Sequence, residues 1–513
     1  MPGKHRTAQE TNAAAPDRGS PPEARRDCRW ARAFLAVVLA LYLALSAAYT
    51  HYLPPGQAPD EHAHFEYVLF LAREGRLPRY GVDDVGYESY QAPLYYTLSA
   101  VVCKLAMWAA SGAPVASERP VPSTDELLAR FPKSPLVPRA QYDLALHAMG
   151  WARELSPSEL AGWRAVRWFT ILLGAIGIVL AWAIVLTVAP HRPWLAATAA
   201  AGIALLPMYE HICAAVGNDP PTVVVLGGVA LMILVVLRDG PSPRRVAALG
   251  ALLGLGMLTK DSANVGLPVA VIAVVLAVGK RREPSPSPSL IVDLGRWLAS
   301  LRWRQLLARL GLMLGVAAVV GGWWYARNTI LYGGPLHYPA NVEKQMPWDF
   351  YLIYPEWLPR VLGLSLPMTF RNFWAGFSWT NVVLPLWWYW LLLGVSLLPV
   401  PGLVAMVADL RARRLTPSVW QVRAVWMLAL LLSLLALAVT AHAMFIGLGG
   451  GSQGRYYFPA LPSIGLLAAA GLARLLPWRA RPALPFIVGG LMLAFNLYCL
   501  VGYVVPYYRA WVG

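Results

Sequence analysis

Two adjacent carboxylates and two imidazoles lie together at Asp60, Glu61, His62 and His64, in a chain of 513 residues of which only 14% are charged. A carboxylate can orient an acceptor hydroxyl and take its proton, so this group suits a transfer reaction onto a hydroxyl. The same pattern also begins ordinary surface helices, because Pro59 suits the first helical position and acids offset the positive helix end. Other polar residues must therefore converge on this stretch before it counts as a site.

The composition is that of a polytopic helical membrane protein. Hydrophobic residues make up 57% of the chain, and 22 Trp and 23 Tyr crowd the ends of long apolar runs. Runs of about 18 residues or more recur from Ala33 to Val505, each long enough to cross a hydrocarbon core of ~30 Å. The formal charge of +16 does not indicate nucleic acid, because the basic residues lie mainly in short loops between the runs. Four scattered cysteines without CxxC spacing predict neither a disulfide framework nor a zinc site.

The distribution of arginine and lysine decides the predicted topology. Residues 93–110 are apolar enough to look like a second span, but counting them as one would place most basic loops outside the membrane. We therefore interpret them as a surface helix or one that only dips into the membrane. About eleven spans are then predicted, with the N-terminus inside and the C-terminus outside, at 31–53, 163–189, 194–209, 221–237, 245–258, 263–279, 310–326, 383–408, 422–445, 457–473 and 483–505.

This topology divides the chain into five parts. Residues 1–30 form a polar cytoplasmic tail predicted to be disordered, and 31–53 form the first span. Residues 54–162 form a long exterior loop with juxtamembrane helices, in which the insertion at 112–160 is either a lid or a plain exposed loop. The multi-span region covers 163–505, with a cytoplasmic amphipathic segment at 280–310 and an exterior loop at 327–382, and 506–513 form an exterior tail.

Polar residues near the outer ends of the predicted spans form a set. Ionisable groups close to the hydrocarbon are costly, so their convergence on one face predicts a site. Single members have simpler explanations, since Lys260 could extend its amine to the membrane surface and Arg455 could anchor a loop. The set comprises Asp60, Glu61, His62, His64, Glu88, Gln91, Asn218, Asp219, Lys260, Asp261, Arg327, Asn328 and Arg455.

A helix that starts near Pro59 would carry Asp60, His64 and Tyr67 on one face and an apolar stripe on another. We expect this helix to lie on the membrane and to present Asp60 and His64 to the exterior. Metal binding is not favoured, because His62 and His64 do not share a helical face, and Asp60 and Asp219 remain weak candidate ligands. No cofactor is certain, and a divalent metal is an alternative.

Seven short motifs in order along the chain resemble the GT-C glycosyltransferase superfamily. The nearest branch is similar to the protein O-mannosyltransferases and the lipid A aminoarabinose transferases. The motifs are Asp60-Glu61, Tyr90-Gln91-Ala92-Pro93-Leu94-Tyr95-Tyr96, residues 167–174 from Arg167 to Gly174, Gly217-Asn218-Asp219, residues 254–260 from Gly254 to Lys260, Trp323-Trp324-Tyr325-Ala326-Arg327-Asn328, and residues 454–459 from Gly454 to Pro459. Gln91-Ala92-Pro93 departs from relatives that have two prolines there, sometimes preceded by a lysine, so phosphate binding would depend on arginines elsewhere.

The resemblance implies inverting transfer of a sugar from a polyprenyl phosphate to a glycan, lipid or protein acceptor, on the outer side of a prokaryotic plasma membrane. It implies that Asp60 is the base or orienter of the acceptor, with Glu61 beside it. Because negative charge grows on the leaving phosphate, cations must face it. The candidates for that role are Arg167, Lys260, Arg327 and Arg455, and the other candidates that line the site are His64, Glu88, Gln91, Asn218 and Asp219.

Two other functions use the same residues. A transporter or flippase of lipid-linked glycans would bind the head group with these charges, and a lipid-linked oligosaccharide ligase would transfer a whole glycan. Transport predicts ionisable residues or broken helices deep within the spans. Stretches such as 165–188 and 422–440 contain no internal acids, which favours the glycosyltransferase.

Overall fold

The structure is a computed structural model that describes residues 22–111, 147–148, 150–152, 154–279, 301–336, 349–446 and 453–512. Three sequence predictions lie wholly or largely outside the described residues. They concern most of the N-terminal tail, most of the 112–160 insertion and the larger part of the 280–310 segment.

Helices make up most of the described chain, because a helix satisfies its own backbone hydrogen bonds where lipid offers no partners. The helices up to residue 278 are α1 (Pro22–Tyr52), α2 (Glu61–Glu74), α3 (Leu94–Ala109), α6 (Pro157–Val188), α7 (Pro193–Ala204), α8 (Pro207–Cys213), α9 (Asp219–Asp239), α10 (Pro243–Met257) and α11 (Gly266–Val278). The rest contains α13 (Trp303–Ala317), α14 (Trp323–Tyr332), α15 (Phe350–Ile353), α16 (Trp357–Trp374), α17 (Leu386–Leu397), α18 (Pro399–Arg411), α19 (Val419–Ile446), α20 (Leu461–Leu475), α21 (Leu484–Cys499) and α22 (Val505–Val512).

Short elements interrupt or connect these helices. The 3₁₀ turns are η1 (Tyr87–Tyr90), η2 (Asp261–Val265), η5 (Gly454–Ala460) and η6 (Arg481–Ala483), and the π-helical turns are η3 (Ala318–Gly322) and η7 (Leu500–Val504). Strands β1 (Gly376–Phe377) and β2 (Val382–Val383) pair antiparallel, with Gly376 opposite Val383 and Phe377 opposite Val382.

The prediction of an all-α polytopic membrane protein is confirmed. Within the described residues, nine helices are long and apolar enough to cross a membrane, and a tenth results if α7 and α8, bent by 63° to each other, count as one span. The count of eleven is not confirmed. The predicted span at 245–258 corresponds to α10, whose 15 residues reach ~22 Å and fall short of a ~30 Å core.

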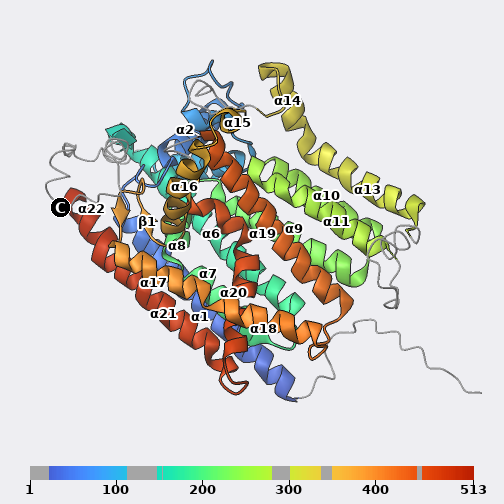
Figure 1. The fold of residues 1–513 in the computed structure, drawn as a ribbon. Coiled ribbons are helices and arrows are strands. Elements are labelled where there is room, and N and C mark those ends of the chain that lie inside the picture. Colours follow the sequence, from blue (N-terminus) through green and yellow to red (C-terminus); the bar gives the residue numbers. More distant parts are fainter. Residues whose placement is uncertain are drawn as a thin grey trace, which may run out of the picture.

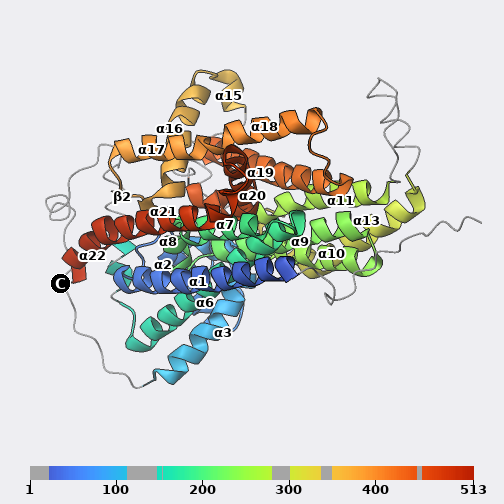
Figure 2. The same cartoon turned by 90° about the horizontal axis from the view of Figure 1, so that it is seen from below.

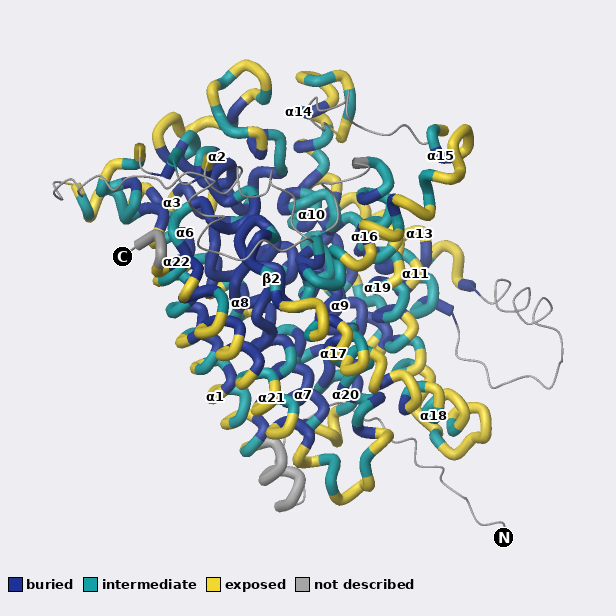
Figure 3. Tube along the Cα trace, turned by 60° about the vertical axis from the view of Figure 1, so that its left-hand side comes forward, coloured by how far each residue is buried: buried dark blue, intermediate teal, exposed yellow. Residues whose placement is uncertain are grey.

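The long helices lie alongside one another, with α7 in contact with α6, α20, α21 and α1 (Figures 1 and 2). The N-terminal end of α1 lies at one end of this bundle, while α2, α14 and α15 lie at the other. Buried segments concentrate around α8 and β2, and α18 is largely exposed (Figure 3). All seven residues of α8 are buried.

The orientation expected for α2 is wrong. His64 and Tyr67 do share a face, but both are buried and face the protein instead of the exterior. The reason is that Tyr96 on α3 supplies a hydroxyl to His64 and a ring that stacks on Tyr67 at 4.1 Å. The polar face of α2 therefore contributes to an internal site.

Labelling from outside tests the predicted topology. In a cysteine-free background, Gly150→Cys should react with an impermeant maleimide in intact cells, because residues 54–162 are predicted to be exterior and a side chain at Gly150 meets open space. Pro243→Cys, at the exposed start of α10, should react only after the cells are permeabilised. The reverse pattern would overturn the interpretation of residues 93–110.

Candidate functional site

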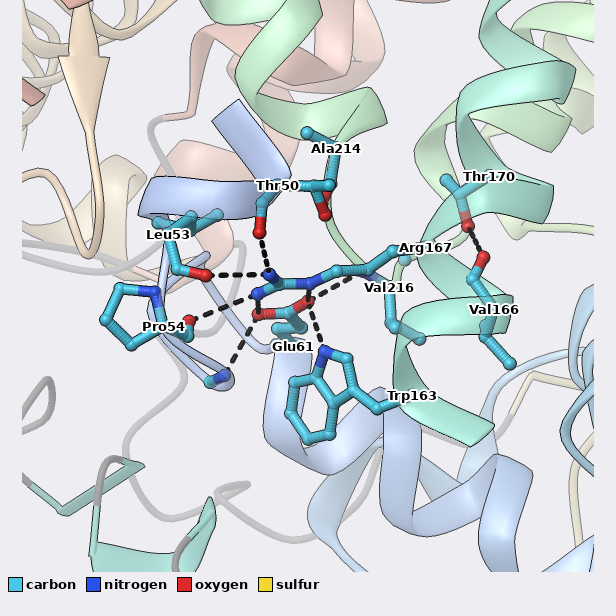
Figure 4. A network of polar contacts seen from close by, with 12 residues as sticks. Thr50, Leu53, Pro54, Glu61, Trp163, Val166, Arg167, Thr170, Ala214 and Val216 are labelled. Carbon is cyan, nitrogen blue, oxygen red and sulfur yellow. Dashed lines mark hydrogen bonds and ion pairs between the residues drawn. The ribbon is translucent and has the colours of Figure 1, made fainter. Parts of the chain in front are cut away.

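A buried ion pair joins the start of α2 to α6 (Figure 4). Glu61 is fully buried, and its Oε1 accepts a hydrogen bond from Arg167 Nε at 2.7 Å while its Oε2 accepts one from Arg167 Nη2 at 2.8 Å. Trp163 Nε1 and the backbone N–H groups of Gly56 and Val216 donate to the same carboxylate at 3.0–3.1 Å. The Glu61 carboxylate is thus surrounded by donors, as a buried charge requires.

The Arg167 guanidinium is equally occupied. Its Nη1 donates to the carbonyls of Leu53 at 2.7 Å and Thr50 at 3.2 Å, and its Nη2 also donates to Pro54 O at 3.1 Å. Only 3% of its side chain is exposed. Arg167, predicted to bind phosphate, therefore holds the end of α1 and the loop that follows it.

Local sequence explains how α6 presents these side chains. The helix starts with a capping box, in which Ser156 Oγ accepts from Glu159 N and Glu159 Oε2 accepts from Ser156 N. Trp163 and Arg167 follow one turn apart on the same face, because residues i and i+4 are neighbours on a helix. Both reach Glu61 for that reason.

The loop before α2 is fixed by close contacts at Gly56. This residue has φ +79°, and a Cβ there would lie 2.8 Å from the carbonyl oxygen of Ala148, so only glycine fits. Its carbonyl accepts a hydrogen bond from Trp379 Nε1 at 3.0 Å, and Trp379 lies in the turn between β1 and β2. Residues far apart in sequence thereby set the path of the chain into Asp60.

Asp60 occupies the N-cap position of α2 in a strained conformation, and its side chain makes no capping hydrogen bond. Its φ of 63° lies in the left-handed region, which costs roughly 1–3 kcal/mol for a residue other than glycine. Its Oδ2 accepts from Arg455 Nη2 at 2.5 Å and its Oδ1 from the Tyr87 hydroxyl at 2.8 Å, and 20% of the side chain is exposed. Burial alone would raise the pKa of Asp60, but the charge of Arg455 and these hydrogen bonds lower it below the ordinary value. The carboxylate is therefore ionised at neutral pH.

Asp60 is the first member of an alternating series of ionised groups. Arg455, in η5, also approaches Asp219 Oδ2 with its Nε at 3.3 Å, and Lys260 Nζ lies 2.5 Å from Asp219 Oδ1. Asp219 is the first residue of α9, where the helix dipole favours a negative charge. The ring of Tyr456 lies within 5.1 Å of Lys260 Nζ and 5.6 Å of the Arg455 guanidinium carbon. We call Asp60, Arg455, Asp219 and Lys260 the ion chain.

A wall of polar groups adjoins the ion chain. His64 Nδ1 and the Tyr96 hydroxyl lie 2.8 Å apart, and Asn218 Nδ2 donates to Tyr96 Oη and Gln91 Oε1. Gln91 Nε2 donates in turn to Glu88 Oε2 at 2.7 Å. Burial lowers the pKa of His64 to about 3, whereas burial, with a further contribution from the charge of Asp60, raises the pKa of Glu88 to about 7. The carboxyls of Asp60 and Glu88 thus have pKa values shifted in opposite directions.

The structure brings together most of the predicted site residues. Besides the ion chain, it places His64, Glu88, Gln91 and Asn218 in the adjoining wall. Arg327 lies elsewhere, donating to Pro78 O at 2.7 Å and facing the ring of Trp324. Sequence reasoning missed Tyr87, Tyr96 and Trp163, whose only signal was their place within or beside motifs already chosen for other residues.

Two buried polar residues were also missed. Glu210 and His211 lie in α8, fully buried, and Glu210 Oε2 accepts from Ser46 Oγ at 2.6 Å while His211 Nε2 accepts from Ser378 N at 3.2 Å. They lie immediately beyond the predicted span at 194–209, where a loop is expected. The structure buries them because the chain continues as α8 after the bend.

A small recess adjoins the ion chain at Arg455. Its volume of about 10 Å³ is roughly that of one water molecule, and it is lined by Pro59, Met208, Ile212, Asn372, Gly376, Thr380, Gln453, Gly454 and Arg455. Asp60 and Asp219, the weak candidate metal ligands, both face Arg455. Among the residues that the structure describes, no group of three or more His, Cys, Asp or Glu side chains is placed to hold a metal ion.

Comparison with known proteins gives a family and distant structural likenesses. The profile of the family described as "Predicted membrane protein (DUF2142)" matches residues 41–464, and no curated protein matches the sequence. Similar solved structures include ArnT from Cupriavidus metallidurans bound to undecaprenyl phosphate, with 15% identity, a TM-score of 0.43, and coverage of 93% of this chain and 74% of that chain. The oligosaccharyltransferase of Archaeoglobus fulgidus in complex with Zn and sulfate has 11% identity, a TM-score of 0.44, and coverage of 91% and 53%. Both of these proteins have the GT-C fold.

Removing one partner of the buried Glu61–Arg167 pair tests how much the pair contributes to the stability of the fold. Glu61→Gln should lower the free energy of unfolding by about 3–5 kcal/mol, because it leaves the Arg167 charge buried without its counter-charge. Thermal unfolding in detergent measures the loss. The control is Arg73→Gln, which breaks the Arg73–Glu159 pair, whose arginine is 57% exposed, and should cost no more than about 1 kcal/mol. Equal losses in the two variants would contradict the prediction.

The raised pKa of Glu88 predicts how stability depends on pH. The folded protein retains the Glu88 proton up to about pH 7, whereas the unfolded chain releases it near 4.5, so the free energy of unfolding falls as pH rises through this window. Glu88→Gln removes that contribution, and its apparent melting temperature should fall less between about pH 5 and 8 than that of the wild type.

Glu66→Gln provides a second, independent test of the same pH dependence. Burial raises the pKa of Glu66 to about 7 as well, so this variant should remove a separate share of the slope, and the double variant should be flatter than either. A wild-type slope in Glu88→Gln would show that this group titrates at its ordinary pKa.

Proposed function

We propose that this chain, which belongs to the DUF2142 family of predicted membrane proteins, is a glycosyltransferase that moves a sugar from a polyprenyl-phosphate donor to an acceptor hydroxyl. The supporting observation is the ion chain. It combines an ionised, partly exposed carboxylate with two cations, of which Arg455 lines the recess. The reaction takes place on the extracytoplasmic side of a prokaryotic plasma membrane, the side to which charge distribution assigns Asp60.

In the proposed reaction, the acceptor oxygen attacks the anomeric carbon on the face opposite the phosphate. The bond between that carbon and the phosphate oxygen breaks, its electron pair stays with the phosphate, and the acceptor proton passes to Asp60. Attack from the opposite face inverts the anomeric configuration. Asp60 suits the base because it is ionised, and 20% of its side chain reaches the surface of the site.

The cations of the ion chain are the proposed ligands of the donor phosphate. Arg455 and Lys260 both form ion pairs with Asp219, and Arg455 lines the recess. A phosphate bound beside them meets two cations already held in place by Asp219, which lowers the reorganisation needed when negative charge grows on the leaving group. Arg327, bonded to Pro78 O, positions residues 76–80 in this proposal instead of binding phosphate.

The remaining candidates are proposed to position these groups. Glu61 and Arg167 fix the loop that carries Asp60, since their hydrogen bonds to each other and to the backbone use the atoms that a substrate would need. His64, Gln91 and Asn218 form a neutral hydrogen-bonding surface for the sugar. Glu88, with its raised pKa, stays largely protonated below about pH 7 and does not compete with Asp60 for cations.

One observation favours a second candidate, a transporter or flippase of lipid-linked glycans. Such a protein is expected to have broken helices and ionisable groups within its spans. The bent pair α7 and α8 carries Glu210, fully buried, with its Oε1 lacking a hydrogen-bond partner among the described residues. The glycosyltransferase remains the stronger proposal because the ion chain places a base against Arg455, while a second cation, Lys260, pairs with the same Asp219 that Arg455 approaches.

Substitution of the base tests the proposed function. Asp60→Asn should reduce transfer of sugar from polyprenyl phosphate by a factor of about 10²–10⁴, because the amide cannot accept the acceptor proton. The assay uses purified protein in nanodiscs with the polyprenyl-phosphate sugars and acceptors of the source membranes. Asp84→Asn, an exposed acid of the same exterior loop, is the control and should retain wild-type activity.

Two results would contradict the proposal. Full transfer by a folded Asp60→Asn protein would remove Asp60 from the mechanism. Movement of lipid-linked glycan across vesicles by the wild type, without any transfer, would identify a translocator.

A further inference from the structure

Five aromatic side chains gather beside Asp60, and each has an edge that can form hydrogen bonds. The centroid of the His62 ring lies 5.6 Å from that of Trp379, 5.7 Å from Tyr87, 6.1 Å from Trp151 and 6.3 Å from His147. His62 comes from α2, Trp379 from the turn between β1 and β2, and Tyr87 from η1, while His147 and Trp151 precede α6. We call these five residues the aromatic platform.

The platform has a buried floor and an exposed rim. Trp379 and His62 are 7% and 8% exposed, and Trp379 is anchored by its hydrogen bond to Gly56 O. Trp151 is half-buried, whereas His147 is exposed and Tyr87 is 43% exposed. The four other rings pack on His62 at interplanar angles of 47–85°, so a ligand meets ring edges as well as ring faces.

Tyr87 connects the platform to the proposed base. Its ring belongs to the platform, and its hydroxyl donates to Asp60 Oδ1 at 2.8 Å. Because a carboxylate oxygen can accept more than one hydrogen bond, an acceptor hydroxyl can bind Oδ1 of Asp60 beside the Tyr87 hydroxyl. An acceptor bound in this way has its body over or beside the platform.

We propose that the aromatic platform binds the acceptor and that the acceptor is a neutral glycan. The inference rests on the proposed function. A sugar ring has an apolar C–H face that packs on the electron-rich face of an aromatic ring, and a rim of hydroxyls that pairs with imidazole, indole and phenol edges. His62 Nδ1 is buried and has no hydrogen-bond partner among the described residues, so one such edge is unused.

Other acceptor classes fit the platform less well. A lipid chain would be matched by aliphatic side chains, whereas all five members carry polar edges. An extended peptide is commonly held by an unpaired strand edge, but β1 and β2, the two strands among the described residues, are two residues each and pair with each other. Burial lowers the pKa of His62, so its ring is neutral and adds no attraction for an anionic acceptor.

The test begins with a strain of the source organism that lacks this chain. Glycosyl-linkage analysis should show that a cell-envelope polysaccharide has lost one glycosyl residue, while protein and lipid extracts are unchanged. Loss of sugar from protein or lipid instead would overturn the glycan acceptor and leave the proposed transferase intact. No change in any of the three fractions would contradict the proposed function itself.

The platform is then tested with the polysaccharide isolated from that strain and the polyprenyl-phosphate form of the missing sugar. Trp151→Leu should raise the KM for the polysaccharide about tenfold and leave the KM for the donor unchanged, because it removes a ring of the platform and no residue of the ion chain. Trp151→Phe keeps a ring and should retain most of the affinity. Trp478→Leu, an exposed tryptophan next to Arg479, is the matched control. A wild-type KM for the polysaccharide in both Trp151→Leu and Tyr87→Leu would overturn the assignment of the platform.

Discussion

Charge burial at Glu61 and Arg167 is the constraint on which the rest of the site depends. Moving both ions out of water costs several kcal/mol each unless donors and acceptors surround them. The protein meets this requirement with backbone groups from the end of α1, the loop after it and the segment after α8, together with the indole of Trp163. Because each of these groups must reach the same pair, segments more than a hundred residues apart are held in one arrangement.

The strained conformation of Asp60 follows from that arrangement. Glu61 is drawn inward to Arg167, and Gly56 is held from the other side by Trp379 and Glu61. The one residue directly before Glu61 must turn the chain sharply, and its side chain points away toward Arg455. The network therefore determines where the exposed carboxylate lies without any of its members needing to touch a substrate.

Patterns local in sequence predicted the spans and the polar groups near their ends, but not the pairing between those groups. Asp60, Asp219, Lys260 and Arg455 are predictable because each lies at the end of an apolar run, and such ends meet at one membrane face. Arg167 also lies near the end of an apolar run, so the sequence does not distinguish it from the phosphate-binding candidates. Its partner Glu61 is 106 residues away, and no spacing rule connects the two. Glu210 was missed for a related reason, since a helix bend within an apolar stretch looks like the end of a span.

The alternating order of the ion chain has a consequence for the electrostatics of the proposed reaction. Two negative and two positive groups balance, and a phosphodiester donor adds one negative charge. When the sugar leaves, the phosphate gains a second negative charge, while Asp60 loses its own by accepting the proton. The net charge inside the site is then the same in substrate and product complexes, so little rearrangement of surrounding dipoles is needed in a poorly hydrated site. Neutralised Asp60 also frees Arg455 from the charge of one of its two carboxylate partners at the moment when the phosphate can use it.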